Sequence, residues 1–338
     1  MATFKIYKLR FTSPLHIGDK HDAPDVSMRT IQSDTLQAAL FSCLAKTGED
    51  LPDDGDMGFV TSSLFPYYQK AADSHPTYFL PMPFQTHPIH STDNSLAKKV
   101  KKVKWVSSDL YGKLLAGDDC IFGKKEGDFS YLQGSYLTTE KLPKDERGSG
   151  DFIISSVAQR VTIGDRTGRD DAKPYYVDRV LFKDFSGLYF LVAGDTSLAE
   201  KAMAILANEG IGTDRNVGFG FFSYSTEDIC IETPEKAEHQ IALSLLIPAS
   251  EEELHAMLDS EDVAYDFDRR GGWITSYSSN TLRKNAIYAF LPGSVFKGTG
   301  KDIQGKIVDL KPAIDFGPSH PIWRDGRSIM LPIIRTSE

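Results

Sequence analysis

The chain has 338 residues, of which 41% are hydrophobic and 25% are charged, and its formal net charge at pH 7 is -9. This composition is typical of a globular protein with room for two domains, and the negative charge argues against a protein that coats nucleic acid through bulk positive charge. The sequence contains no run of 18 apolar residues that would span a membrane, so we expect no membrane contact.

The three cysteines are Cys43, Cys120 and Cys230, which are odd in number and far apart in the sequence. Their spacing indicates neither a metal-binding pair nor a disulfide framework. We therefore expect a protein of the reducing cytoplasm, without a metal ion or a cofactor.

Charge is distributed unevenly along the chain. Residues 96–125 contain eight lysines and three aspartates, whereas residues 225–262 contain eleven acidic residues and one lysine. Residues 265–338 again hold more basic than acidic side chains. The chain can therefore present a local basic surface although its net charge is negative. Its acidic stretch can face a partner protein or solvent.

The first predicted elements are a strand and a helix. Residues 3–11 alternate apolar and polar side chains, which indicates a half-buried strand. Residues 33–47 predict a helix, with Ser33 as its N-cap and Asp34 in its first turn. Its apolar face is formed by Leu36, Ala39, Leu40, Cys43 and Leu44.

The region of about 50–185 is less regular, with polar turn-rich stretches and proline-broken segments. We expect it to form insertions on an N-terminal domain. Within it, residues 96–107 mix lysines with valines and Trp105, which predicts a strand or a hairpin arm. Two roles remain open for this segment, a contact with RNA or an edge strand protected from aggregation by its lysines.

Regular patterning returns at residues 186–194, which predict a strand. A helix over 197–210 follows, in which Ser197 and Glu200 have the spacing of a capping box. The next strand is predicted over 218–226, so these segments form a β-α-β unit.

A second unit begins at residues 241–247, which predict a strand. The helix after it has Ser250 and Glu253 at capping-box spacing, and two more strands are predicted over 283–296 and 328–335. Two such halves indicate an α+β fold of two ferredoxin-like domains, also called RNA-recognition-motif-like, over residues 1–236 and 237–338.

A glycine-rich loop, GIGTDRNVGFG, connects the helix and strand of the first unit. Its glycines allow the backbone to approach a ligand and present N–H groups to an anion, and Arg215 is suited to a phosphate or a base. Asp214 opposes phosphate binding unless it pairs with Arg215 or caps a turn. A helix stop followed by a tight turn explains the same residues, and both interpretations stay open.

Other candidate residues lie outside this loop. His16 is a candidate general acid or base, a structural histidine or an RNA contact, and its acidic and histidine neighbours at 19–22 fit no familiar metal spacing. Arg160 and Lys297 lie in further segments that combine cations with aromatic residues or glycines. The stretch 300–307 fails as a nucleotide-binding P-loop, because Ile307 replaces the hydroxyl that would ligate magnesium.

Segments along nearly the whole chain resemble the subunit-four RAMP (repeat-associated mysterious protein) of the Csm complex, the type III-A CRISPR effector. They occur in that family's order and include LRFTSPLHIG, SDTLQAALFSCL, YFLPMPF, GLYFLVAG, GIGTDRNVGFGFF, GSVFKGTG and HPIWRDGRSIMLPI.

The resemblance implies RAMP architecture and a non-catalytic RNA-binding scaffold. Such a subunit holds the 5′ handle of the crRNA and bridges the large polymerase-domain subunit to the backbone RAMP subunits. The residues expected to contact RNA are His16, Ser33, Arg160, Gly210, Gly212, Arg215, Gly218, Gly220 and Lys297.

The loop departs from the family pattern at two positions. Val217 and Phe219 replace small and basic residues, so we expect this loop to depend more on its backbone and less on charge. Two alternative functions remain. One is a metal-independent endoribonuclease that matures crRNA with His16 as acid or base, and the other is a bridging subunit whose loops are purely structural.

Overall fold

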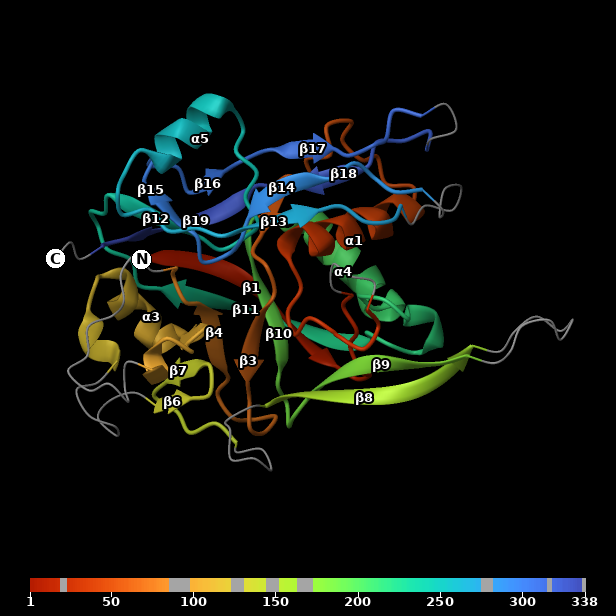
Figure 1. Ribbon diagram of the computed structural model, residues 1–338, viewed down its shortest axis with the longest axis horizontal. Coiled ribbons are helices and arrows are strands. Elements are labelled where there is room, and N and C mark those ends of the chain that lie inside the picture. Colours follow the sequence, from red (N-terminus) through yellow and green to blue (C-terminus); the bar gives the residue numbers. More distant parts are fainter. Residues whose placement is uncertain are drawn as a thin grey trace, which may run out of the picture.

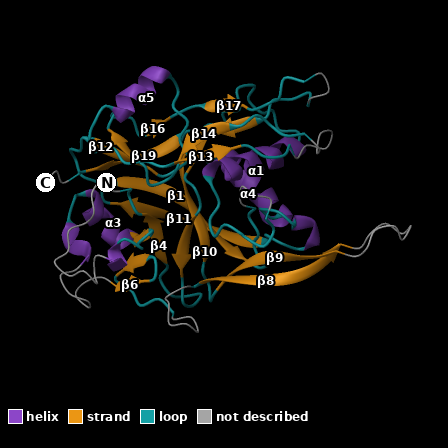
Figure 2. Cartoon of the chain, viewed as in Figure 1, coloured by secondary structure: helices purple, strands orange, loops and turns teal. Residues whose placement is uncertain are grey.

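The computed structural model describes residues 1–18, 23–84, 98–122, 131–143, 152–162, 173–274, 282–314 and 318–335. Strands dominate and helices are few, so the prediction of an α+β fold is confirmed (Figures 1 and 2). Among the described residues, no helix is long and apolar enough to cross a membrane.

A nine-stranded sheet forms the larger part of the molecule. Its strand order is β11-β1-β10-β3-β4-β5-β7-β6, with β2 also paired to β10. The strands are β1 (Ala2–Phe11), β2 (Phe59–Thr61), β3 (Phe65–Tyr68), β4 (Thr77–Pro81), β5 (Trp105–Ser107), β6 (Tyr131–Gln133), β7 (Tyr136–Thr138), β10 (Gly187–Gly194) and β11 (Phe222–Ile231).

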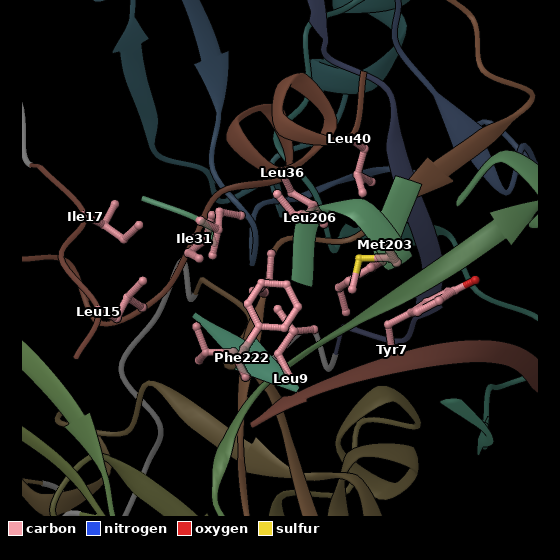
Figure 3. Packing of buried hydrophobic residues seen from close by; sticks show 14 of the residues in the cluster. Tyr7, Leu9, Leu15, Ile17, Ile31, Leu36, Leu40, Met203, Leu206 and Phe222 are labelled. Carbon is pink, nitrogen blue, oxygen red and sulfur yellow. The ribbon is translucent and has the colours of Figure 1, made fainter. Parts of the chain in front are cut away.

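Two helices cover one face of this sheet. They are α1 (Ser33–Lys46) and α4 (Ser197–Glu209), and their apolar faces pack on side chains that point from β1, β10 and β11. Figure 3 shows this core, in which Leu36, Leu40 and Met203 of the helices meet Leu9 and Phe222 of the strands. The predicted apolar face of α1 is thus largely confirmed.

The opposite face of the sheet carries α3 (Ser108–Leu115) and a second sheet with the order β15-β12-β19-β16. The strands of the second sheet are β12 (His239–Ala242), β15 (Val295–Lys297), β16 (Ile303–Gln304) and β19 (Ser328–Ile333). Ile241 and Leu331 of this sheet share an apolar cluster with Ile6 and Leu191 of the large sheet. The two sheets are therefore packed against each other.

Helix α5 (Glu251–Leu258) covers the outer face of the second sheet, where Met257 packs with Phe296. Three two-stranded ribbons complete the described chain. They are β8 (Ile153–Thr162) with β9 (Lys173–Phe182), β13 (Phe267–Arg270) with β14 (Ile287–Phe290), and β17 (Ile307–Asp309) with β18 (Trp323–Asp325). A short 3₁₀ helix also covers Asp119–Phe122.

The structure confirms one predicted helix N-cap, at Ser250, and contradicts those at Ser33 and Ser197. Ser250 accepts a hydrogen bond from the Glu253 amide, which confirms that cap. The N-cap of α1 is Gln32, so the assignment of Ser33 was wrong, because the Ser33 hydroxyl accepts a hydrogen bond from the Leu245 amide instead. The capping box at Ser197 was also wrong, because Thr196 holds that position and makes no side-chain cap.

Residues 50–185 are more regular than their sequence indicates. Strands β2 and β3 pair with β10 near the centre of the large sheet, and β8 and β9 form a ribbon with ten paired positions on each strand. In the lysine-rich segment, Trp105–Ser107 is a strand but residues 98–100 are helical, so the prediction of a strand or hairpin arm is confirmed only at the end of the segment. The predicted strand 241–247 ends at Ala242, and the predicted strand 283–296 is divided between β14 and β15.

Candidate nucleic-acid interface

The glycine-rich loop joins α4 to β11 and pairs with the segment that follows β1. The Gly220 amide donates to the Pro14 carbonyl at 2.8 Å, and the Thr213 amide donates to the His16 carbonyl at 2.9 Å. These bonds come from both sides of the loop tip at Asp214–Gly218. The loop and residues 14–16 therefore form one continuous surface.

Two glycines of the loop are required by close backbone contacts. A Cβ atom at Gly220 would lie 1.9 Å from the Ile211 carbonyl oxygen, and one at Gly212 would lie 2.5 Å from the His16 carbonyl oxygen. Both residues also have positive φ angles, which favour glycine. Gly212 thus allows the loop to approach the 14–16 segment, and Gly220 allows the two ends of the loop to approach each other, so both have a role in the fold that is independent of any ligand.

The tip of the loop is exposed and tightly turned. Asp214 has a left-handed backbone with φ of 60°, the short 3₁₀ helix Arg215–Val217 follows, and Gly218 ends it with φ of 94°. Within the described chain, the amides of Arg215 and Asn216 donate to no acceptor. Free N–H groups next to a left-handed residue are suited to an anion. Gly210 at the end of α4 has φ of 76° and is buried.

Arg160 reaches this loop from the β8–β9 ribbon. Its Nη1 atom lies 3.0 Å from Oδ2 of Asp214, and its guanidinium carbon lies 4.5 Å from the centre of the Phe219 ring. Asp214 therefore pairs with Arg160. On the sequence alone, Arg215 was considered as its partner. Phe219, which is 6% exposed and was singled out as a departure from the family pattern, stacks against Arg160.

Arg215 lies on the exposed side of the loop. Its Nη1 atom is 3.8 Å from Oε2 of Glu209, and the same carboxylate oxygen is 2.6 Å from the Lys46 ammonium. The contact with Arg215 is long, and 43% of the arginine side chain is exposed. The guanidinium is therefore accessible to a phosphate group.

His16 lies beneath this surface and is 5% exposed. Its Nδ1 atom is 2.8 Å from the main-chain oxygen of Asp178 in β9. Its sequence neighbours at 19–22 lie outside the described residues. In the part of the chain that the structure describes, no three histidine, cysteine, aspartate or glutamate side chains are grouped to bind a metal ion.

The structure brings His16, Arg160 and the four loop glycines together with Arg215, but two predicted residues lie elsewhere. Ser33 is buried at the start of α1, where its hydroxyl accepts a hydrogen bond from the Leu245 amide. Lys297 lies on β15, with its ammonium 2.7 Å from the Asp259 carboxylate.

Residues 235–333 match the family model of the CRISPR Csm4 C-terminal domain. The chain is 27% identical to Csm4 of Mycobacterium tuberculosis over 262 residues, which cover 76% of this chain and 75% of that protein. It is 25% identical to Csm4 of Streptococcus thermophilus over 324 residues, which cover 93% and 94% of the two chains. The chain is therefore similar to Csm4 proteins over most of its length, and its residues 235–333 match the Csm4 C-terminal domain. The resemblance found in the sequence is thereby confirmed.

Solved structures share the fold over the whole length. A chain of the Csm3–Csm4 subcomplex of the type III-A CRISPR-Cas interference complex aligns with a TM-score of 0.62 and 20% identity, covering 99% of this chain and 100% of that one. A chain of the Csm1–Csm4 cassette in complex with cA4 aligns with a TM-score of 0.59 and 18% identity over the same shares. At these identities, the likeness concerns the fold.

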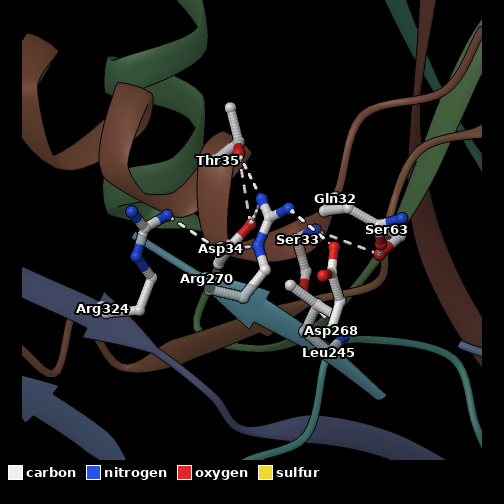
Figure 4. A network of polar contacts seen from close by, with 9 residues as sticks. All are labelled: Gln32, Ser33, Asp34, Thr35, Ser63, Leu245, Asp268, Arg270 and Arg324. Carbon is white, nitrogen blue, oxygen red and sulfur yellow. Dashed lines mark hydrogen bonds and ion pairs between the residues drawn. The ribbon is translucent and has the colours of Figure 1, made fainter. Parts of the chain in front are cut away.

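A buried ion cluster ties the C-terminal region, residues 235–333, to helix α1 (Figure 4). Asp34 accepts two hydrogen bonds from Arg270, at 2.8 and 2.9 Å, and one from Arg324 at 2.9 Å. The carboxylate is 1% exposed. Burial alone would raise the pKa of Asp34, but the two guanidiniums outweigh it and hold the pKa at about 2.

Sequence reasoning missed this cluster and the stacking of Arg160 on Phe219. An aspartate in the first turn of a helix is ordinary, and nothing local connects Asp34 with arginines of the C-terminal region. Phe219 did stand out as a departure from the family pattern. That departure was the available signal, although it did not identify Arg160 as the partner.

Proposed function

We propose that this chain is a non-catalytic RNA-binding subunit of a Csm complex, which holds the 5′ handle of the crRNA. The observation that carries this proposal is the convergence of the loop tip, the 14–16 segment and Arg160 on one surface. These parts come from three separate stretches of sequence. They place the Arg160 guanidinium against Asp214 and Phe219, next to the exposed tip that carries Arg215 and the free amides.

This surface suits a short single-stranded RNA. Such RNA is bound by phosphate contacts from cations and amides, together with shape and stacking. Arg215 and the amides at the tip supply phosphate contacts, and Arg160 supplies a cation whose position is set by Asp214 and Phe219. A few placed cations suffice for this task, which agrees with a net charge of -9.

The proposal includes the protein partners. Solved relatives occur as a Csm1–Csm4 cassette and as a Csm3–Csm4 subcomplex. We extend both associations to this chain, so that it joins the large polymerase-domain subunit to the backbone RAMP subunits. Its acidic stretch, residues 225–262, is a candidate contact for a basic partner surface.

We also propose that the chain consists of two ferredoxin-like domains divided after residue 236. The first would contain the elements β1, α1, β3, β10, α4 and β11, whose strands lie in the order β11-β1-β10-β3. A β-α-β-β-α-β sequence of elements is the pattern of that fold. The second sheet, which begins at His239, would form the core of the other domain.

A ribonuclease role for His16 has no observation in its favour. The imidazole is buried, and its Nδ1 atom is bonded to a main-chain carbonyl. A general acid or base must reach the proton it transfers. We therefore keep the non-catalytic role as the proposal.

The test compares Arg160→Ala, Arg215→Ala and the double variant in a Csm complex reconstituted with crRNA. Lys201→Ala is a matched control, because it removes an exposed cation from the outer side of α4. We expect the double variant to weaken crRNA binding ~10-fold or more. The slope of log K against log salt concentration should become shallower by roughly 0.7 for each lost phosphate contact. Binding equal to that of Lys201→Ala would contradict the proposal.

A further inference from the structure

A second surface with the chemistry of a nucleic-acid site lies on the β13–β14 ribbon, beside α1 (Figure 1). The strands pair with Phe267 opposite Phe290 and Arg269 opposite Tyr288. Alternation along a strand places these four side chains on the same face of the ribbon. We call Phe267, Arg269 and Tyr288 the ribbon face.

The ribbon face is unusually exposed for aromatic residues. Phe267 is 53% exposed and Tyr288 is 61% exposed. Their rings meet edge to face, with centroids 5.8 Å apart, so this contact does not cover both ring faces. Beyond the strand end, Trp273 is 48% exposed and stacks with Arg283 at 4.6 Å.

The opposite face of the ribbon is fixed in place. Ala289 is buried there, and Arg270 makes its paired bonds with Asp34 of α1. These contacts hold the backbone of both strands. The ribbon face is therefore displayed on a supported element, which lowers the entropy cost of binding.

The charge of the ribbon is opposite to that of the whole chain. Residues 267–273 and 282–290 contain four basic residues and one acidic residue, a net charge of +3 in a chain of -9. The acidic residue, Asp268, belongs to the opposite face. Arg269 is exposed and has no ion-pair partner among the described residues. The nearby carboxylate of Asp266 accepts the Phe267 amide at 2.8 Å.

We propose that the ribbon face binds single-stranded nucleic acid, with bases stacked on Phe267 and Tyr288 and a phosphate bound by Arg269. Exposed rings beside an unpaired arginine provide the two contacts that single strands need. The exposed charge of Arg269 favours a polyanion over a neutral protein surface. This site shares no residue with the 210–220 loop, so the inference does not rest on the proposed function.

The experiment measures binding of fluorescein-labelled U15 and dT15 oligonucleotides to the purified full-length chain by anisotropy. The variants are Arg269→Ala and the double change Phe267→Ala with Tyr288→Ala. Tyr288→Phe preserves the ring and serves as the conservative variant, and Lys201→Ala controls for the loss of one cation. Circular dichroism confirms the fold of each protein.

We expect saturable binding that weakens ~5- to 100-fold in the double variant, as for the loss of stacking on one or two bases. Tyr288→Phe and Lys201→Ala should bind as the wild type does. The relative affinity for U15 and dT15 identifies RNA or DNA as the preferred strand, and either preference supports the site. Equal binding by the double variant, or no saturable binding by the wild type, would overturn the proposal.

Discussion

The guanidinium of Arg160 lies 4.5 Å above the ring of Phe219 and donates a hydrogen bond to Asp214 on the same loop. These contacts connect the β8–β9 ribbon to the glycine-rich loop. They also explain how a loop that departs from the family pattern at Phe219 still has a cation at its surface. The cation comes from a neighbouring strand.

The Phe219 ring should therefore contribute more to the free energy of unfolding than its apolar burial alone implies. We expect Phe219→Leu to lower the free energy of unfolding by about 1–2 kcal/mol through lost packing and lost cation–π stacking. Phe219→Lys should cost more, because it places a charge at a buried position beside Arg160. Urea denaturation measures both, with the exposed Val217→Leu as control. Equal stability of Phe219→Lys and wild type would contradict the account.

The loop glycines provide a matched pair. In Gly220→Ala the new methyl group meets the Ile211 carbonyl oxygen, whereas Gly218→Ala adds a methyl group in open space. We expect a loss of stability of about 3 kcal/mol or more at Gly220 and about 1 kcal/mol at Gly218, where the cost arises from the left-handed backbone. Thermal denaturation distinguishes the two, and similar losses at both positions would be evidence against the described packing.

The ion cluster around Asp34 leads us to predict a larger loss of stability. Asp34→Asn leaves Arg270 and Arg324 without their shared carboxylate, and we expect a loss of about 3–5 kcal/mol. Asp25→Asn, an exposed site, should change stability little. The measurement is the denaturant midpoint at pH 7. A midpoint within error of the wild type would rule out the cluster as a stabilising contact between α1 and the C-terminal region.

The same carboxylate gives a pH dependence. The pKa of Asp34 is about 2 in the folded chain and lies near 3.9 in an unfolded one, so its stabilisation is complete above about pH 4 and is lost as the pH falls toward 2. The stability difference between wild type and Asp34→Asn should therefore shrink over that range. A constant difference from pH 6 to pH 2 would contradict the assigned pKa.

Lys284 should make the stability of the chain depend on pH in the alkaline range. Burial and the nearby Arg324 lower its pKa to about 8, below the 10.5 of a free lysine. Between about pH 8 and pH 10.5 the lysine is neutral in the folded chain but still protonated in the unfolded one. The free energy of unfolding should therefore rise with pH over this range. Lys284→Met should remove this rise and stabilise the chain at pH 7. Parallel pH profiles for the two proteins would show that Lys284 carries no such penalty.

Local patterns predicted the local structure of the chain. Alternation located β1, and the serine–glutamate spacing located the start of α5. The same spacing failed at Ser197, because the Glu200 side chain pairs with Lys5 of β1. Patterns describe what a segment can do, and tertiary partners decide among the possibilities.

Long-range contacts were beyond such patterns. Asp34 and Arg324 are 290 positions apart. Ser33 was expected to be a cap from its position in the sequence, which gives no sign of its partner Leu245, 212 positions away. The loop could be recognised as a candidate site from its glycines and Arg215. Its connection to Arg160 required the register of the β8–β9 ribbon, which the sequence of that region did not indicate.

The most direct test of the RNA-handle proposal is ultraviolet crosslinking of the reconstituted complex, followed by mapping of RNA-linked peptides. We predict that the 5′ handle of the crRNA crosslinks to peptides of this chain that contain residues 210–220 or Arg160, and that these crosslinks diminish in the Arg160→Ala and Arg215→Ala double variant. Handle crosslinks confined to other subunits would contradict the proposal, and would leave this loop as a packed turn within a bridging protein.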